Sequence, residues 1–350
     1  MNKNIKIDNH IIGEGQPVYT IAEMSANHLM DYERAKRIIL EAKKAGADAI
    51  KLQTYRPDTI TIDCRGEEFM ATKGSPWEGM NLYDLYKTAY TPWEWHKGLF
   101  DYAKELGITC FSSPFDLTAV DFLEELGAPA YKIASFEIND IPLIRKVAKT
   151  GKPVIISTGI AEMADIELAL QTCKENGNEN VILLKCVSEY PTPYSELNLR
   201  TITNMRETFN CEVGLSDHSM GNAVDIAAVA LGACVVEKHL TISREDGGPD
   251  GSFSMEPEEY KEMVDSIRNV EKALGQVRYE LTDKQKNSRG RSRSLYVVKD
   301  MKKGELFSPE NIKSIRPGFG LHTKYYDEIL GKTATSDLKK GTAMQWKYVQ

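Results

Sequence analysis

The sequence has no long apolar run, and its first residues are not hydrophobic. Hydrophobic residues make up 41% of its 350 residues and charged residues 27%, yet no uninterrupted apolar stretch approaches the roughly 18 residues that a membrane-spanning helix requires. The first ten residues, MNKNIKIDNH, are polar and alternating, unlike a secretory signal peptide. We therefore expect a globular protein that does not enter a membrane and works in the cytoplasm.

Paired cysteines are also missing. The six cysteines stand at positions 64, 110, 173, 186, 211 and 234, and no two of them are spaced as CxxC. Cys110, Cys186 and Cys234 lie inside apolar runs, as the reduced thiols of a core do. This distribution argues against a disulfide framework and against a structural zinc site.

Basic residues interleaved with aromatic ones are absent as well, and the net charge is −7, so nucleic acid is not an expected partner. The charge is unevenly spread. Residues 287–350 hold 13 Lys and Arg against 6 Asp and Glu, a net +7, which leaves −14 for residues 1–286. A basic tail after an acidic body indicates either docking of the tail on a body, its own or a partner's, or binding of an acidic ligand.

The sequence does contain eight short apolar runs, separated by helix-like stretches of ten or more residues. The runs begin at VYTIAE (18), AIKLQ (49), TCFSSP (109), YKIAS (131), VIISTG (154), VILLKC (181), VGLSDH (213) and CVVEKH (234). Strand–helix alternation repeated eight times predicts an α/β fold, a (β/α)8 barrel. Because such barrels take roughly 250 residues, a second, small and mostly β domain is expected after it.

The predicted organisation has three parts: a barrel domain over 1–280, a polar linker over 281–292 and a small domain over 293–350. Residues 3–19 are expected to form a hairpin that turns at Gly13–Gly15 and plugs the barrel floor. Residues 55–92 form a long excursion, interpreted as a loop with short helices over the barrel mouth. Helices are expected over 32–45, 93–106, 117–126, 141–149, 163–175, 198–209, 223–231 and 257–274.

Chemically useful residues follow the ends of these strands, where barrel enzymes place their active sites. In chain order the ends carry Glu23, Lys51 and Gln53, Ser112 and Ser113, Lys132, Ser135 and Glu137, Ser157 and Thr158, Lys185 and Ser188, Ser216 and His218, and Lys238 and His239. Lysines, hydroxyls, carboxylates and two histidines at one mouth indicate an anionic substrate and a possible metal.

The two histidines end neighbouring strands, so their imidazoles can approach one divalent transition metal ion. The alternative is two unrelated histidines, one of them bonded to a carboxylate. The lysines, hydroxyls and the Ser157-Thr158-Gly159 amides suit a phosphate or carboxylate. The alternatives are lysines at a solvated rim or a Schiff-base lysine. Glu23, Glu137 and Asp250 are candidate acid–base groups or salt-bridge partners of the lysines.

These segments together resemble the sialic acid synthase family. The similarity is carried by AEMSANH, KLQ, FSSPFD, YKIAS, STG, KCVSEYPTP, GLSDHS, EKHLT and GGPD in that order, and by the tail SLYVVKDMKKGELFSPENIKSIRPGFG, which is similar to an antifreeze-like (SAF) domain. The resemblance spans nearly the whole chain. It implies metal-assisted condensation of phosphoenolpyruvate with an N-acetylated sugar aldehyde, giving a nine-carbon 2-keto acid and phosphate.

The resemblance also implies roles for residues. His218 and His239 would hold a divalent metal (Mn²⁺, Mg²⁺ or Co²⁺). Catalysis would fall to Glu23, Glu137, Lys132 and Lys185. Phosphoenolpyruvate would be bound by Lys51, Ser112, Lys132, Ser135, Ser157, Lys185, Ser188 and Ser216. The sugar would be bound by Gln53, Tyr190, Asp250 and Arg316, the last reaching the site from the tail of a second subunit in a domain-swapped homodimer.

Two segments favour the pseudaminic acid synthases within this family. LYDLYKTAYTPWEWH (82–96) is similar to them, and the loop GPDGSFS (248–254) lacks the histidine that N-acetylneuraminate synthases commonly have after the aspartate. The expected sugar is 2,4-diacetamido-2,4,6-trideoxy-β-L-altropyranose, which suits an aromatic-rich site. The alternatives are an N-acetylneuraminate or legionaminate synthase, a Schiff-base aldolase, and a binding module attached to a barrel without catalytic activity.

Overall fold

The computed structural model describes residues 4–75 and 77–350, so position 3 of the expected hairpin and position 76 of the expected excursion lie outside the described residues. The chain forms two compact units, Met1–Gly275 and Gln276–Gln350. Among the described helices, none has the length and apolar character needed to span a membrane.

The first unit is a closed parallel barrel, which confirms the predicted fold. Its strand order is β10-β3-β4-β5-β6-β7-β8-β9, so each strand pairs with its sequence neighbour and β10 closes on β3. The strands are β3 (Tyr19–Glu23), β4 (Ala49–Thr54), β5 (Thr109–Pro114), β6 (Tyr131–Ile133), β7 (Val154–Ser157), β8 (Val181–Cys186), β9 (Glu212–Asp217) and β10 (Val235–His239). All eight apolar runs of the sequence are strands of this barrel.

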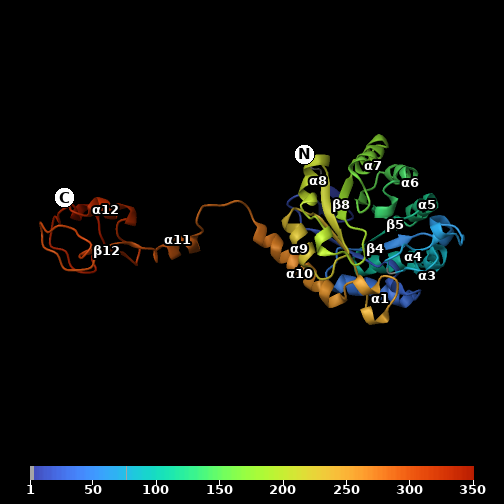
Figure 1. Ribbon diagram of the computed structural model, residues 1–350, viewed down its shortest axis with the longest axis horizontal. Coiled ribbons are helices and arrows are strands. Elements are labelled where there is room, and N and C mark those ends of the chain that lie inside the picture. The colour runs from blue at the N-terminus through green and yellow to red at the C-terminus, as the bar shows by residue number, and fades with distance from the viewer. Residues whose placement is uncertain (1–3, 76) are drawn as a thin grey trace. The chain divides into compact units, whose positions relative to one another are not determined.

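Helices follow the strands and lie around the outside of the barrel (Figure 1). They are α1 (Tyr32–Lys44), α4 (Trp93–Leu106), α5 (Leu117–Glu125), α6 (Ile141–Ala148), α7 (Met163–Glu175), α8 (Thr201–Phe209), α9 (Ala223–Ala230) and α10 (Pro257–Leu274). Asp31 caps α1 by accepting from the amides of Glu33 and Arg34, as its position predicted. Helix α8 begins three residues later than expected, because Asn198 has a positive φ of 47° that breaks the helical path.

Side chains alternate along each strand between the barrel interior and the helices outside. Ile21, Phe111 and Ile155 belong to an interior cluster that also contains Ile5 and Ile12 of the N-terminal hairpin, β1 (Ile5–Ile7) and β2 (His10–Ile12). The hairpin therefore closes the barrel floor with isoleucine side chains. Its turn lies at residues 8–9 rather than at Gly13–Gly15, which instead connects β2 to the barrel.

The excursion after β4 holds helices α2 (Pro57–Ile60) and α3 (Leu82–Ala89), with a short 3-10 helix at Glu67–Phe69 between them. It is attached to the barrel by its indoles. Trp93 donates to the carbonyl of Tyr55 at 3.1 Å, and Trp77 donates to the carbonyl of Pro249 at 3.1 Å. The second contact joins the excursion to the loop that follows β10.

The second unit is small, with a core of Leu295, Val297, Phe307 and Ile312 among others. Strands β11 (Ser294–Val297) and β12 (Ile312–Ile315) pair antiparallel, and helix α12 spans Tyr326–Ile329. Helix α11 (Asp283–Arg289) lies in the segment expected to be a linker. It forms because Thr282 and Gln285 make a reciprocal capping box at its start.

Candidate active site

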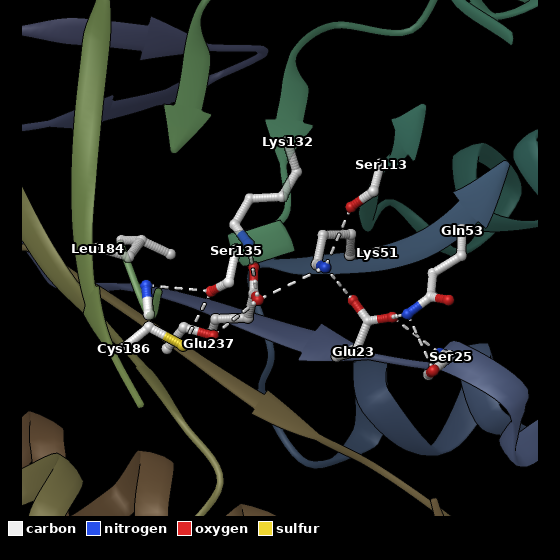
Figure 2. Close-up of polar contacts among 12 residues, drawn as sticks. Glu23, Ser25, Lys51, Gln53, Ser113, Lys132, Ser135, Leu184, Cys186 and Glu237 are labelled. Carbon is white, nitrogen blue, oxygen red and sulfur yellow. Dashed lines mark hydrogen bonds and ion pairs between the residues drawn. The ribbon is translucent and has the colours of Figure 1, made fainter. Parts of the chain in front are cut away.

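A buried network of lysines and glutamates fills the mouth of the barrel, that is, the C-terminal ends of its strands (Figure 2). Lys51 of β4 is ion-paired with Glu23 of β3, and its ammonium lies 3.4 Å from Glu237 of β10. Lys132 of β6 lies 3.3 Å from the same Glu237 oxygen, to which the Ser216 hydroxyl donates at 3.1 Å. Two cations from different strands thus share one carboxylate.

Glu237 was given no role in the sequence analysis, although it is central to this network. The signal was present, since Glu237 stands two residues before His239 and the period of a strand is two. Both side chains therefore face the barrel interior, while Lys238 between them faces outward. Glu237 is 4% exposed, and its Oε2 has no hydrogen-bond partner.

Burial and mutual charge set the ionisation of this network. Burial alone would raise the pKa of Glu237, but Lys132 and Lys51 outweigh it and hold that pKa below its usual range. Burial lowers the pKa of Lys132 despite the attraction of Glu237, and nearby Lys51 adds to the lowering. Burial likewise raises the pKa of Glu23, which Lys51 only partly offsets. The network therefore holds closely balanced charges, which an incoming anion or proton can redistribute.

Glu137 is a second carboxylate beside Lys132. It ends a short 3-10 turn, Ser135–Glu137, that directly follows β6. Burial raises its pKa to about 7, against the lowering effect of Lys132, and its Oε2 is enclosed without a hydrogen-bond partner. A carboxyl group with a pKa near neutrality suits proton transfer at physiological pH.

The imidazole rings of His218, directly after β9, and His239, at the end of β10, meet edge to face. The ring centroids of His218 and His239 are 5.3 Å apart. The Nδ1 of His218 lies 2.9 Å from the carbonyl oxygen of Val187, and because a carbonyl only accepts, Nδ1 carries a proton. Burial lowers the pKa of His218, but Cys186 and this carbonyl outweigh burial and raise it, so a metal would bind Nε2 by displacing a proton. Burial and His218 keep the pKa of His239 well below its usual value, so its imidazole is neutral, and its buried Nδ1 has no hydrogen-bond partner.

Neutral imidazoles with a free nitrogen, one of them oriented by a backbone carbonyl, are the form in which histidine binds metal ions. The two residues therefore fit a metal as a pair. No group of three or more His, Cys, Asp or Glu side chains in the described residues is arranged to hold a metal by itself. A metal here would complete its coordination with oxygen atoms of substrate or water.

Three serine hydroxyls line the side of the mouth next to Lys132. The Gly159 amide donates to the Ser135 hydroxyl at 3.2 Å, and the hydroxyls of Ser157 and Ser188 are buried without hydrogen-bond partners. A Cβ atom on Gly159 would collide with Ser188 Oγ and lie 2.6 Å from Ser135 Oγ. Glycine is thus required here for the serines to approach the backbone, and the hydroxyls remain available to an acceptor-rich ligand.

Neutral polar groups and aromatic rings occupy the other side of the mouth. Gln53 donates to Glu23 at 3.2 Å and to Ser25 at 2.9 Å, while the buried Asp250 accepts from the Ala26 amide at 3.3 Å. The centroid of the Tyr190 ring lies 4.4 Å from the ring centroid of His218, 5.1 Å from that of Phe253 and 5.8 Å from that of Trp77. Carboxamide, carboxylate and aromatic groups in this combination suit a sugar with apolar substituents.

Three of the residues expected at the mouth do not lie there. Ser112 faces outward, where its hydroxyl is 2.6 Å from that of Thr54, and the interior hydroxyl of β5 is that of Ser113, which accepts from Lys51 at 3.3 Å. Lys185 directly precedes the inward-facing Cys186 in β8 and therefore faces outward. Its ammonium donates to the Cys186 carbonyl at 3.0 Å. Lys238 is enclosed behind the barrel wall, with Asp217 among its partners.

The sequence of this chain is similar to known proteins over almost its whole length. The NeuB family model matches residues 38–279. The chain belongs to the NeuB family. Its residues 292–350 match the SAF domain model. The pseudaminic acid synthase of Campylobacter jejuni serotype O:2 is 49% identical, with 94% of this chain and 95% of that protein covered. The pseudaminic acid synthase of Helicobacter pylori is 43% identical, with 94% and 97% covered.

A solved structure of the same kind supports the fold of this NeuB-family chain. It is the N-acetylneuraminic acid synthetase of Leptospira borgpetersenii in complex with citrate, 33% identical, with a TM-score of 0.73 and with 82% of this chain and 95% of that chain covered. Residues 292–350, most of the second unit, form its SAF domain, in which the residue expected to contact the sugar, Arg316, is exposed directly after β12.

Proposed function

We propose that this NeuB-family chain is a transferase that condenses phosphoenolpyruvate with 2,4-diacetamido-2,4,6-trideoxy-β-L-altropyranose and water, and releases pseudaminic acid and phosphate. The observation that carries the proposal is the pair of buried lysines sharing Glu237 beside unpartnered serine hydroxyls, at the mouth of a closed barrel. The relatives at 43% and 49% identity, both pseudaminic acid synthases, support this choice of product.

Phosphoenolpyruvate is assigned to the lysine side of the mouth. Lys51 and Lys132 supply the positive charge that a phosphate and a carboxylate require, and the hydroxyls of Ser135, Ser157 and Ser188 supply donors. Ser216 orients Glu237 between the two lysines. In this proposal Ser113 replaces Ser112, and Lys185 does not contact the substrate, because of the faces on which these side chains lie.

A divalent metal is assigned to His218 and His239. NeuB-family synthases are metal-dependent in general, and the two imidazoles fit one metal as a pair. Bound there, the metal would act as a Lewis acid on the open-chain aldehyde of the sugar. The Val187 carbonyl accepts from Nδ1 of His218, so Nε2 is the nitrogen that would bind the metal, and burial keeps His239 neutral.

The reaction forms a carbon–carbon bond between C3 of phosphoenolpyruvate and the aldehyde carbon, and the aldehyde oxygen takes up a proton from solvent to become a hydroxyl. Water adds at C2 and gives up a proton to Glu137 or Glu23, both with raised pKa values. The tetrahedral intermediate then loses phosphate through cleavage of its C2–O bond. Lys132 stabilises the charge that develops on the departing phosphate.

The sugar is assigned to the side of the mouth formed by Gln53, Asp250 and Tyr190. Because that side also carries Phe253 and Trp77, it suits a sugar that has a methyl group where others have a hydroxyl. Arg316 is proposed to contact an N-acetyl group from the SAF domain of a second subunit in a homodimer. The basic tail and acidic barrel unit favour such docking.

Phosphate release from phosphoenolpyruvate in the presence of Mn²⁺ tests the proposed reaction. Three sugars are compared: the diacetamido-trideoxy-altrose, its isomer 2,4-diacetamido-2,4,6-trideoxy-mannose, and N-acetylmannosamine. We expect strong release with the first sugar. Release with N-acetylmannosamine alone would support the condensation but show that the proposed sugar is wrong. Absence of release with all three sugars would contradict the condensation itself.

Burial lowers the pKa of Lys132 and so favours one other reaction class, a Schiff-base aldolase, because a larger neutral fraction of the amine can attack a carbonyl. Borohydride reduction in the presence of substrate separates the two. Covalent labelling at Lys132 would support the aldolase, whereas unmodified protein with metal-dependent phosphate release supports the synthase.

A further inference from the structure

A second buried ion cluster lies directly behind the two histidines, on the outer face of the barrel wall. Lys238 is 1% exposed, and Asp217 and Asp225 are equally enclosed. The Lys238 ammonium is ion-paired with Asp217 and lies 3.2 Å from Asp225 of helix α9. This cluster faces away from the mouth, so the proposed reaction makes no direct use of it.

The Lys238 ammonium also holds the backbone that follows β9. It donates to the carbonyl of Ser219 at 2.9 Å and to the carbonyl of Gly221 at 2.8 Å. Asp217 in turn accepts from the amide and the hydroxyl of Ser219, each at 2.9 Å. A single cation from β10 therefore closes the turn at residues 217–221, and His218 is the second residue of that turn.

Strand alternation connects this cluster to the mouth. Lys238 and Asp217 are register partners on neighbouring strands and face outward. The residues next to them, His239 and His218, face inward. Fixing the outward pair therefore fixes the backbone from which both imidazoles project.

We propose that Lys238 is a positioning residue for the metal site: by clamping the turn at residues 217–221 to β10, it holds His218 and His239 at the spacing at which one metal ion can bind both. This inference rests on the proposed metal site. Asp225 has the supporting role of keeping the Lys238 ammonium against the two carbonyl groups.

The test uses the full-length protein and the variant Lys238→Met, which keeps most of the side-chain volume and removes the charge. Mn²⁺ alone is titrated into each metal-free protein by calorimetry. We expect the variant to bind Mn²⁺ about tenfold more weakly, as is found for residues that orient metal ligands indirectly. With ¹⁵N-histidine labelling, the Nδ1 proton of His218 that bonds Val187 should exchange slowly in the wild type and rapidly in the variant.

Arg268→Met is the matched control. Arg268 pairs with Asp48 at 3.0 Å and donates to the Val18 carbonyl at 2.8 Å, at the start of β3 and so at the opposite end of the barrel. We expect this variant to melt at a lower temperature but to bind Mn²⁺ like the wild type. Equal Mn²⁺ affinity and an unchanged His218 signal in Lys238→Met would reduce Lys238 to a structural role.

Asp225→Asn provides the second variant should Lys238→Met fail to fold, because it keeps both the lysine and the side-chain shape. We expect a smaller loss of Mn²⁺ affinity with the same change in the His218 signal, and wild-type behaviour would overturn the proposal. If the wild type itself binds no Mn²⁺, the proposed metal site is wrong. The His218 exchange measurement, which needs no metal, then shows separately whether Lys238 positions the imidazole.

Discussion

At the scale of single residues, Glu137 connects ionisation to both stability and activity. Its folded pKa of about 7 lies above the value of about 4.3 for a free glutamate, so the folded state binds the proton more tightly than the unfolded state. Stability must then fall as pH rises through this interval. We expect Glu137→Gln to gain melting temperature relative to the wild type at pH 8 and to gain almost none at pH 4, where the folded wild type is protonated and the unfolded state largely so.

The same substitution tests the catalytic role of Glu137. If the ionised carboxylate accepts a proton from water, wild-type turnover rises with pH through about 7, and the glutamine variant loses both most of the turnover and this limb of the profile. A variant that keeps the limb would transfer the role to Glu23, whose pKa burial also raises.

The sequence motifs indicated which strand ends meet at the mouth, but not which of two adjacent side chains faces inward. Lys51, Lys132 and the two histidines meet at the mouth because their side chains face inward. Ser112 faces outward in β5, so the adjacent Ser113 meets Lys51 instead. Which of two adjacent serines faces inward depends on the register of the whole barrel, and the sequence was read for strand ends rather than for faces.

At the scale of elements, the turn after β7 is the part of the site most sensitive to a single added carbon. A methyl group on Gly159 would collide with Ser188 Oγ and crowd Ser135 Oγ. We expect Gly159→Ala to raise the KM for phosphoenolpyruvate at least about tenfold, equivalent to about 1.4 kcal/mol of binding, with little change in the KM for the sugar. Steady-state kinetics with each substrate varied in turn measures the effect.

Gly66→Ala is the control for this prediction, because a Cβ there would make only ordinary contacts, at 3.8 Å to Cys64 and 3.9 Å to Phe69. Its backbone φ of −64° is also open to alanine. If the KM for phosphoenolpyruvate rises in both variants, or in neither, Ser135 and Ser188 do not bind phosphoenolpyruvate.

Elements were easier to predict than residues because their signals are local. Apolar runs mark the strands, and Asp31 marks the start of α1. The errors were also local: the capping box of Thr282 and Gln285 in a polar segment was overlooked, and the hairpin turn was assigned to glycines although residues 8–9 provide it. Neither error affects the predicted position of the candidate active site, because the barrel strands alone determine that position.

At the scale of the whole molecule, the proposed exchange of SAF domains between two subunits can be tested by complementation. His239→Ala disables the barrel site of its own chain, and Arg316→Ala disables the site that its SAF domain serves. In a mixed dimer with exchanged domains, one site carries both lesions and the other carries none. Because random mixing gives half mixed dimers, each with one intact site of two, activity should return to about a quarter of the wild-type level. If Arg316 serves its own barrel, every site carries one lesion and the mixture stays inactive, so phosphate release after co-refolding of the two variants decides between the arrangements.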